Sequence, residues 1–321
     1  MARRRGTSGI NALLGIDKPA GMSSHDVVNA VRRAFDERRV GHAGTLDPLA
    51  TGVMVVGVGQ ATRLLGLVTA DSKRYLSRFS FGRETVTDDA EGETRVSAHV
   101  PERVGDVAFA RASMGILRAM TSQTPPSYSA ISVGGRRAYA MARDGEQVTL
   151  AERPISVTEA EVIAVGVDDK TGEPYWDVVT RVSKGTYVRA LARDLGRALG
   201  SAAYVSDLRR VESGTVTMGM CLTLERLADL RASSAPIPWL DPLATLQMPG
   251  VELGYDDIRR VINGSSVRVR EARGDVLEDA SVGITHDGRL YAVARRHDDE
   301  LAPQTVFVDG IEGVAKGDMH D

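Results

Sequence analysis

The apolar and polar positions of the chain divide most of it into short strands and amphipathic helices. Residues 53–58 form an unbroken apolar run, which predicts a buried strand, and residues 75–81 alternate like a half-buried strand. Apolar side chains at helical spacing predict helices over residues 104–120 and 185–200. Because these helices are mixed with strands and with hairpin patterns at residues 204–222, we predict an α+β fold around a mixed, largely antiparallel sheet.

Prolines mark the best candidate for a domain boundary. Residues 233–249 contain prolines at positions 236, 238, 242 and 249, and proline disfavours both helix interiors and central strands. We therefore expect a flexible basic arm at residues 1–9, a large domain at residues 10–232, a linker at residues 233–249 and a small β-rich domain at residues 250–321.

The composition is ordinary for a water-soluble globular protein, with 42% hydrophobic and 26% charged residues. No apolar run reaches the roughly 20 residues that a membrane helix needs, and the basic N-terminus is not followed by a signal-peptide core. We therefore expect a cytoplasmic protein. Cys221 is the single cysteine, which excludes an intramolecular disulfide and a thiolate metal cage.

The net charge of −3 conceals an uneven distribution of charge. Residues 1–40 carry eight basic and four acidic groups, and residues 181–210 carry seven basic and two acidic groups. Residues 251–321 carry nine basic and fifteen acidic groups and so cancel this excess. Since binding to nucleic acid depends on the local field, the N-terminal part is able to present a basic face to RNA, although solvated helix faces would have the same composition.

The string GHAGTLDPLATG, residues 41–52, contains the strongest candidate for a catalytic side chain. It places one carboxylate, Asp47, in a Gly- and Pro-rich loop directly before the apolar run. Pro48 restricts both its own backbone and that of Asp47, so the loop is held firmly. An isolated Asp-Pro pair usually only caps a turn, but a firmly held loop beside a buried strand is also where folds present reactive groups.

This string resembles the catalytic loop of the bacterial TruB family, the tRNA pseudouridine-55 synthases, and the resemblance covers about Gly15 to Val211. In that family the aspartate of the motif is catalytic, which makes Asp47 the expected nucleophile. The resemblance implies that uridine 55 in the T-loop of tRNA is flipped into a pocket and isomerised to pseudouridine. It implies no cofactor and no metal.

The resemblance assigns two further catalytic residues. Arg189, in the string KGTYVR, matches the arginine that pairs with the catalytic aspartate and keeps it ionised in a dry pocket. Tyr75, in the string KRY, matches the tyrosine that lies against the target base. Taken singly, Arg189 would be a solvated helix arginine and Tyr75 a half-buried strand tyrosine.

Four residues are candidates for binding the substrate. Tyr187 would line the pocket and Leu208 would pack beneath the base, although both residue types are also common in cores. His42 matches a histidine that takes part in opening the RNA loop, whereas a lone loop histidine is most often structural. Lys18 belongs to a second family motif with Pro19, and we interpret it as structural or phosphate-contacting.

Two other regions bear on RNA binding. Residues 124–153 form a Gly-flanked insertion with arginines and tyrosines, whose composition fits either a cover over nucleic acid or a plain basic surface helix. In the TruB family this insertion folds over the tRNA stem-loop, and a PUA-type domain often occupies the place of residues 250–321. We expect the tRNA T-stem-loop as the partner, no membrane, and a monomer without an obligate protein partner.

Two alternative functions rest on other features. Gly57 and Gly59 follow an apolar strand as in a dinucleotide-binding loop, but Thr62 stands where that fingerprint needs its third glycine. A pure RNA-binding or RNA-chaperone role would use the same basic surface without turnover, and an accessory tRNA-folding role is also compatible with the family.

Overall fold

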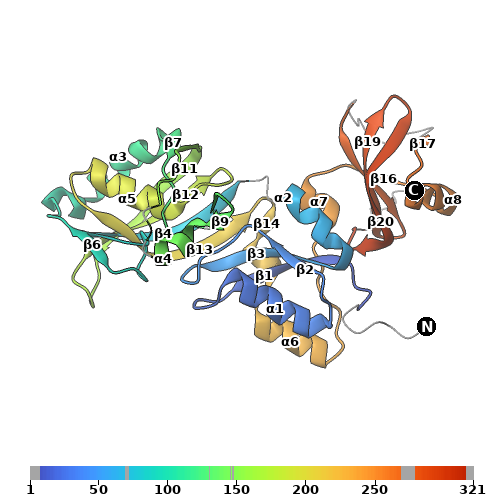
Figure 1. Ribbon diagram of the computed structural model, residues 1–321, viewed down its shortest axis with the longest axis horizontal. Helices are drawn as coiled ribbons and strands as arrows, with labels where there is room; N and C mark the ends of the chain where they lie inside the picture. Colours follow the sequence, from blue (N-terminus) through green and yellow to red (C-terminus); the bar gives the residue numbers. More distant parts are fainter. Residues whose placement is uncertain are drawn as a thin grey trace. The chain divides into compact units, whose positions relative to one another are not determined.

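The computed structural model describes residues 8–68, 72–129, 131–144, 146, 148–268 and 279–315. The chain forms two compact units (Figure 1). The first unit comprises Met1–Pro48, Gly52–Ala70 and Ser213–Asp321, and the second comprises Leu49–Thr51 and Asp71–Glu212. Most of the predicted basic arm at residues 1–9 lies outside the described residues.

The sheet of the first unit is centred on the apolar run predicted from the sequence. β3 (Thr51–Val58) pairs antiparallel with both β1 (Ala12–Lys18) and β2 (Val40–Ala43). Val55 of β3 belongs to one core cluster and Val56 to another, so both faces of the strand are buried. A strand buried on both faces needs no polar alternation, which explains the unbroken run.

Helices and helical turns supply the apolar partners of this sheet. In the first core cluster, η1 (Gly59–Leu64) and α2 (Leu65–Val68) contribute apolar side chains. In the second cluster, α1 (Ser24–Phe35) and α6 (Leu224–Ala232) do so. The second cluster joins Val31 of α1 and Leu227 of α6 to Ile16 of β1. α1 begins at a capping box in which the Ser23 side chain accepts the Asp26 N–H and the Asp26 carboxylate accepts the Ser23 N–H.

The C-terminal part of the first unit is β-rich, as predicted. β18 (Ser281–His286), β19 (Arg289–His297) and β20 (Glu300–Glu312) form an antiparallel meander. β16 (Gly250–Glu252) pairs parallel with β18, β17 (Val267–Arg268) pairs antiparallel with β20, and α8 (Tyr255–Ile262) packs its buried residues into the same core.

The proline-rich segment at residues 233–249 is folded against the rest of the first unit. It contains α7 (Pro242–Leu246), and the Leu240 N–H donates to the Leu13 carbonyl at 2.9 Å. β20 also pairs parallel with β1, and Phe307 shares a core cluster with Leu13. The short elements β14 (Val216–Thr217), η3 (Met218–Met220) and β15 (Cys221–Leu222) complete this unit, with β15 parallel to β1.

The second unit has its own run of neighbouring strands. β11 (Val157–Val167), β12 (Pro174–Val182), β4 (Lys73–Phe81) and β13 (Ala203–Ser213) lie in that order, and β12 is antiparallel to both β11 and β4. α3 (Val107–Arg118) and α5 (Val188–Ala198) pack against these strands, and Trp176 of β12 is fully buried between the rings of Phe81 and Phe109. The turn η2 (Glu102–Gly105) precedes α3.

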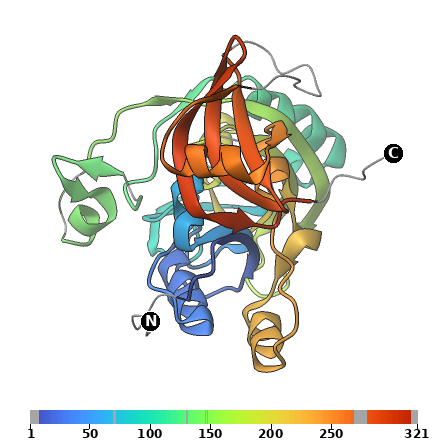
Figure 2. The ribbon, with the colours of Figure 1, turned by 90° about the vertical axis from the view of Figure 1, so that its right-hand side faces the viewer.

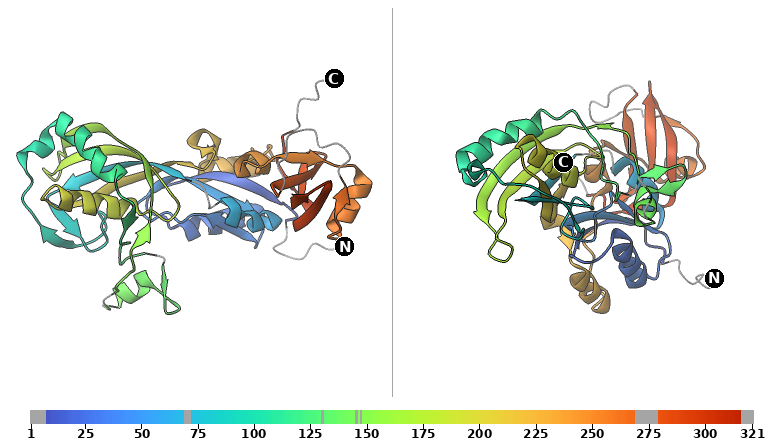
Figure 3. Two further views of the ribbon diagram at one scale, coloured as in Figure 1. Left: turned by 90° about the horizontal axis from the view of Figure 1, so that it is seen from above. Right: turned by 60° about the vertical axis from the view of Figure 1, so that its left-hand side comes forward.

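Two excursions leave the strands of the second unit. One is the hairpin of β5 (Arg83–Thr85) and β6 (Thr94–Ser97), whose tip is the acidic segment between them. The other is the predicted insertion, which is closed at its base by β7 (Ser122–Gln123) paired with β10 (Arg153–Pro154). It contains β8 (Ser132–Val133), β9 (Arg136–Arg137) and α4 (Ala138–Arg143), and it projects from the strands and helices of its unit (Figures 2 and 3).

These elements confirm the predicted fold class, an α+β protein with mixed but largely antiparallel pairing. Within the described ranges, no helix has the length and apolarity needed to cross a membrane.

Candidate active site

The Asp47 loop is held on both sides of its carboxylate. Asp47 is half-buried between β2 and β3. On its N-terminal side, the Ser24 hydroxyl accepts the Leu46 N–H at 2.8 Å and donates to the Leu46 carbonyl at 3.0 Å. Because Ser24 is buried in the first turn of α1, the start of this helix fixes the backbone directly before Asp47.

Lys18 holds the other side of the loop. Its ammonium group donates to the Pro48 carbonyl at 3.1 Å and to the Pro19 carbonyl at 3.0 Å, and the Gly21 N–H also donates to Pro48 at 2.9 Å. Lys18 is completely buried, so in this structure it supports the loop and presents no surface to a phosphate. Of the two roles that we considered for Lys18, the contacts favour the structural one.

Two glycines with positive φ angles flank Asp47 in the motif. His42, half-buried on β2, stands opposite Val56 of β3 and five residues before Asp47. Gly44 and Gly52 have φ values of +83° and +104°, which side-chain-bearing residues rarely adopt. At the end of the loop, Arg209 Nη1 donates to the Thr51 hydroxyl at 3.1 Å. The glycines of the motif therefore shape the turn that presents Asp47.

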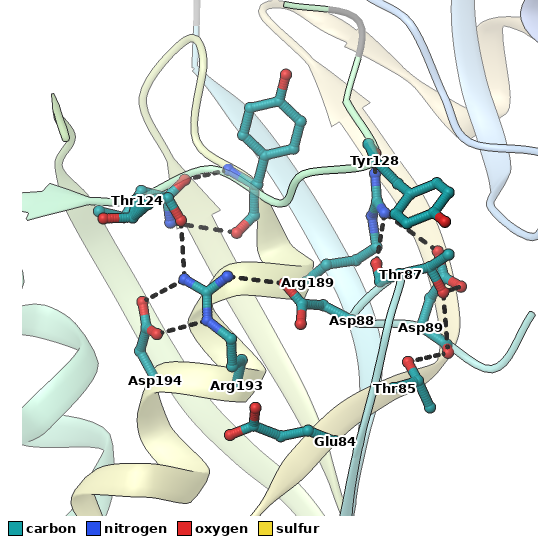
Figure 4. Close-up of polar contacts among 12 residues, drawn as sticks. Glu84, Thr85, Thr87, Asp88, Asp89, Thr124, Tyr128, Arg189, Arg193 and Asp194 are labelled. Carbon is teal, nitrogen blue, oxygen red and sulfur yellow. Dashed lines mark hydrogen bonds and ion pairs between the residues drawn. The ribbon is translucent and has the colours of Figure 1, made fainter. Parts of the chain in front are cut away.

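Arg189 is a buried cation in the second unit, with only 3% of its surface exposed. Figure 4 shows it among its polar partners. Its guanidinium donates to the Thr87 carbonyl at 2.6 Å and to the Tyr128 carbonyl at 3.0 Å, and its Nη1 lies 3.3 Å from a carboxylate oxygen of Asp89. Arg189 lies in the first turn of α5, where the helix dipole disfavours a positive charge, so these partners offset that cost. Arg189 is therefore buried and not a solvated helix arginine, whereas its pairing with Asp47 stays a prediction.

Asp89 is one residue of this site that sequence reasoning missed. Besides Arg189, its carboxylate accepts the Thr87 hydroxyl at 2.5 Å and the Glu91 N–H at 3.1 Å. Asp89 is 3% exposed, although it lies in a segment whose acidic and polar composition predicts a solvated hairpin tip. The one sequence feature that could have indicated a buried site is the pair Asp88-Asp89 beside two threonines. Its arginine partners, Arg189 and Arg193, lie about a hundred residues further along the chain, so the pair could not be matched with them.

A second arginine of α5 continues the network one turn later (Figure 4). Arg193 donates to Asp88 at 2.7 Å, to Asp194 at 2.8 Å and to the Thr124 carbonyl at 2.8 Å. Burial alone would lower the pKa of the Arg193 guanidinium, but the hydrogen bond with Asp194 and the charge of Asp88 outweigh it and raise the pKa. Arg193 is therefore a permanent cation between α5, the acidic hairpin tip and the base of the insertion.

The remaining predicted residues also lie in the second unit. Tyr75 is on the buried side of β4 opposite Thr180, with 8% of its surface exposed, and Leu208 of β13 is buried. Tyr187 is half-buried and forms the N-cap of α5, two residues before Arg189. Tyr187 and Arg189 therefore both lie at the N-terminus of α5.

Several arginines of the second unit are paired with carboxylates. Arg74 binds Glu159 at 2.7 Å, and Arg136 of the insertion is held by Asp144 at 2.7 Å and by Glu146 at 2.6 Å. Among the residues that the structure describes, no cluster of histidine, cysteine or carboxylate side chains has the arrangement needed for a metal ion.

Comparison with known proteins identifies the family. Residues 32–188 match the N-terminal domain of the TruB family pseudouridylate synthases, and residues 189–243 match the tRNA pseudouridylate synthase B C-terminal domain. The tRNA pseudouridine synthase B of Arthrobacter sp. (strain FB24) is 40% identical over 313 residues, which is 96% of this chain and 100% of that protein. The protein of the same name from Mycobacteroides abscessus is 47% identical over 286 residues, covering 88% of this chain and 91% of that protein.

Solved structures show the same fold at lower identity. The chain resembles one in the crystal structure of a Cbf5-Nop10-Gar1 complex with a TM-score of 0.65 and 21% identity, over 96% of this chain and 87% of that one. A chain of the archaeal box H/ACA sRNP Nop10-Cbf5 complex gives a TM-score of 0.61 and 19% identity, over 92% and 85%. With two relatives at least 40% identical over most of their length, this chain belongs to the TruB family of pseudouridylate synthases.

Proposed function

We propose that this enzyme converts uridine 55 in the T-loop of tRNA to pseudouridine and that Asp47 supplies the catalytic carboxylate. The relatives named tRNA pseudouridine synthase B support tRNA as the substrate. The observation that carries the assignment of Asp47 is its loop, in which the backbone on both sides of the carboxylate is fixed by Ser24 and Lys18. Such preorganisation is what a group that must meet a reacting atom requires.

The isomerisation exchanges one bond of the uracil for another. The bond between N1 and the ribose C1′ breaks, a bond between C5 and C1′ forms, C5 loses its proton and N1 gains one. Asp47 acts as the nucleophile that carries the covalent intermediate, and Arg189 is its proposed cationic partner. The buried ion pair with Asp89 and the two carbonyl contacts hold the guanidinium of Arg189 in one orientation.

The other candidate residues receive binding roles. Tyr75 is proposed to lie against the flipped base, with Tyr187 and Leu208 around it, and His42 to contact the opened RNA loop. The insertion at residues 124–153 is proposed to cover the T-stem-loop. We further propose that the enzyme acts as a cytoplasmic monomer without a cofactor.

Release of tritium from C5 of uracil tests the substrate and the position together. A tRNA transcript labelled at C5 of its uridines is incubated with the enzyme, and a second transcript has cytidine in place of uridine 55. We expect release from the first transcript and none from the second. Equal release from both would refute position 55, and binding without release would leave an RNA-binding protein.

A further inference from the structure

The base of the insertion is fastened to the start of α5 through a single carboxamide. Gln123 is 2% exposed, its Oε1 accepts the Tyr187 N–H at 2.6 Å, and its Nε2 donates to the Tyr187 carbonyl at 3.2 Å. The N-cap of α5 has no hydrogen bond from its own side chain, so Gln123 supplies from a distant segment the backbone contact that a capping-box residue usually makes. This bond pair fixes the backbone two residues before Arg189.

Two further bonds run from the same segment to the same helix. The Thr124 carbonyl accepts from Arg193 at 2.8 Å, and the Tyr128 carbonyl accepts from Arg189 at 3.0 Å (Figure 4). Pro125 and Pro126 lie between these anchors and are buried, and each fixes its own φ. Residues 123–128 therefore form a stiff strap, anchored near both ends to α5.

The strap is also continuous with the projecting part of the insertion. The Tyr139 N–H of α4 donates to the Ser129 carbonyl at 3.0 Å, directly after the strap. At the base, Gln123 pairs in the β-ribbon with Arg153, so both limbs of the insertion meet at this residue. A displacement of the insertion therefore changes the strap, and the strap contacts the guanidinium of Arg189.

We infer that Gln123 is a positioning residue that couples the placement of the insertion on RNA to the orientation of Arg189. It touches neither substrate nor reacting atoms and acts through Tyr187 and the strap. The inference rests on the proposed function, since it assigns Arg189 to the reaction and the insertion to RNA binding. Its consequence is that loss of the carboxamide slows the chemical step and leaves tRNA affinity nearly intact.

The first test replaces Gln123 by an apolar residue of similar length. For Gln123→Met we expect the single-turnover rate at saturating enzyme to fall about ten- to a hundredfold, because small misplacements of catalytic groups cost that much. We expect the Kd for tRNA, measured by filter binding, to change less than about twofold, since Gln123 is buried and offers no surface to RNA. Ser122→Ala is the matched control, because Ser122 lies in the same ribbon but its hydroxyl binds Glu152 at 2.5 Å and not α5.

A second variant keeps the inference testable if Gln123→Met does not fold. In Gln123→Glu, the protonated side chain can both accept from the Tyr187 N–H and donate to its carbonyl, whereas the carboxylate can only accept. The rate of this variant relative to wild type should therefore rise as the pH is lowered, with thermal melting followed in parallel. A pH-independent ratio, a wild-type rate in folded Gln123→Met, or a loss confined to tRNA affinity would overturn the inference. Failure of the wild-type enzyme to release tritium from tRNA would instead refute the proposed function.

Discussion

At the scale of single residues, buried charged groups hold the candidate catalytic groups in place. Lys18 and Arg189 are both buried, and each donates to two backbone carbonyls: Lys18 to Pro19 and Pro48, Arg189 to Thr87 and Tyr128. A charge taken out of water is costly unless its donors are satisfied. These side chains therefore fix the geometry of the backbone around them, and their carbonyl contacts offset part of the cost of burying the charge.

Lys18→Met tests separately how this lysine affects the stability of the fold and the geometry of the Asp47 loop. The substitution takes a donor from the Pro19 and Pro48 carbonyls in a buried site, so we expect the free energy of unfolding to fall by about 1–3 kcal/mol in urea titrations. The Pro48 carbonyl loses a donor, and we expect the single-turnover rate to fall at least about tenfold because the Asp47 loop relaxes.

Lys170→Met is the control for this substitution, because Lys170 is an exposed lysine in a turn of the second unit. An unchanged rate in folded Lys18→Met would show that the loop does not depend on this clamp.

At the scale of elements, the hairpin of β5 and β6 is joined to α5 by an ion-pair network. Glu84 of β5 accepts two bonds from Arg197 of α5, both at 2.6 Å, and one from Arg95 of β6 at 2.7 Å. Burial would raise the pKa of the Glu84 carboxyl, but the hydrogen bonds from Arg197 and Arg95 outweigh it, and the pKa lies below its usual value.

This shift predicts an acid-sensitive contribution to stability. A carboxyl whose pKa is lower in the folded state stabilises the protein fully above its unfolded pKa and loses that contribution as the pH falls through the folded value. The unfolded pKa of a glutamate is about 4.3. We therefore expect the wild-type protein to lose thermal stability below about pH 4.3. Glu84→Gln should be less stable at pH 7, and its melting temperature should fall less steeply as the pH is lowered below that value.

Melting curves between pH 3 and pH 7 check this expectation. Glu161→Gln is the control, because Glu161 is an exposed glutamate of β11 in the same unit. An equal fall in melting temperature for wild type and Glu84→Gln between pH 7 and pH 3 would contradict the role of the network.

Local sequence patterns predicted the elements well and the contacts between them poorly. The apolar run of β3, the alternation of β4 and the helical spacing of α3 and α5 follow from patterns within a few residues of each other. Asp89 and Gln123 could not be assigned, because their partners Arg189 and Tyr187 lie far along the chain and no periodicity connects them. For Asp47 and Arg189, only the resemblance to a family supplied their roles.

At the scale of the whole molecule, the C-terminal β-rich part shares a core with the N-terminal strands. β20 pairs with β1, and Leu290, Phe307 and Ile311 lie in the same buried cluster as Leu13 and Val55. The proline-rich segment at residues 233–249 also binds β1, because the Leu240 N–H donates to the Leu13 carbonyl. The segment that the prolines mark as a linker is therefore folded against the first unit.

Truncation after residue 249 tests this shared core. Each large apolar side chain removed from it contributes about 1.5–3 kcal/mol of burial, so we expect the shortened chain to be destabilised by several kcal/mol in urea and to melt at a lower temperature. Full-length Phe307→Ala keeps the C-terminal strands but removes a fully buried ring from the shared core, so it should lose about 3–5 kcal/mol. A shortened chain as stable as the full-length protein would show that the two parts fold independently.

The assignment of Asp47 is the central claim, and Asp47→Asn tests it most directly. The amide has the size of the carboxylate but is not nucleophilic, so the variant should bind tRNA like wild type. We predict that C5 tritium release from the tRNA transcript, measured under single-turnover conditions with tRNA binding followed in parallel, is abolished in this variant. Release at a rate near that of the wild type would contradict the assignment of Asp47 as the nucleophile.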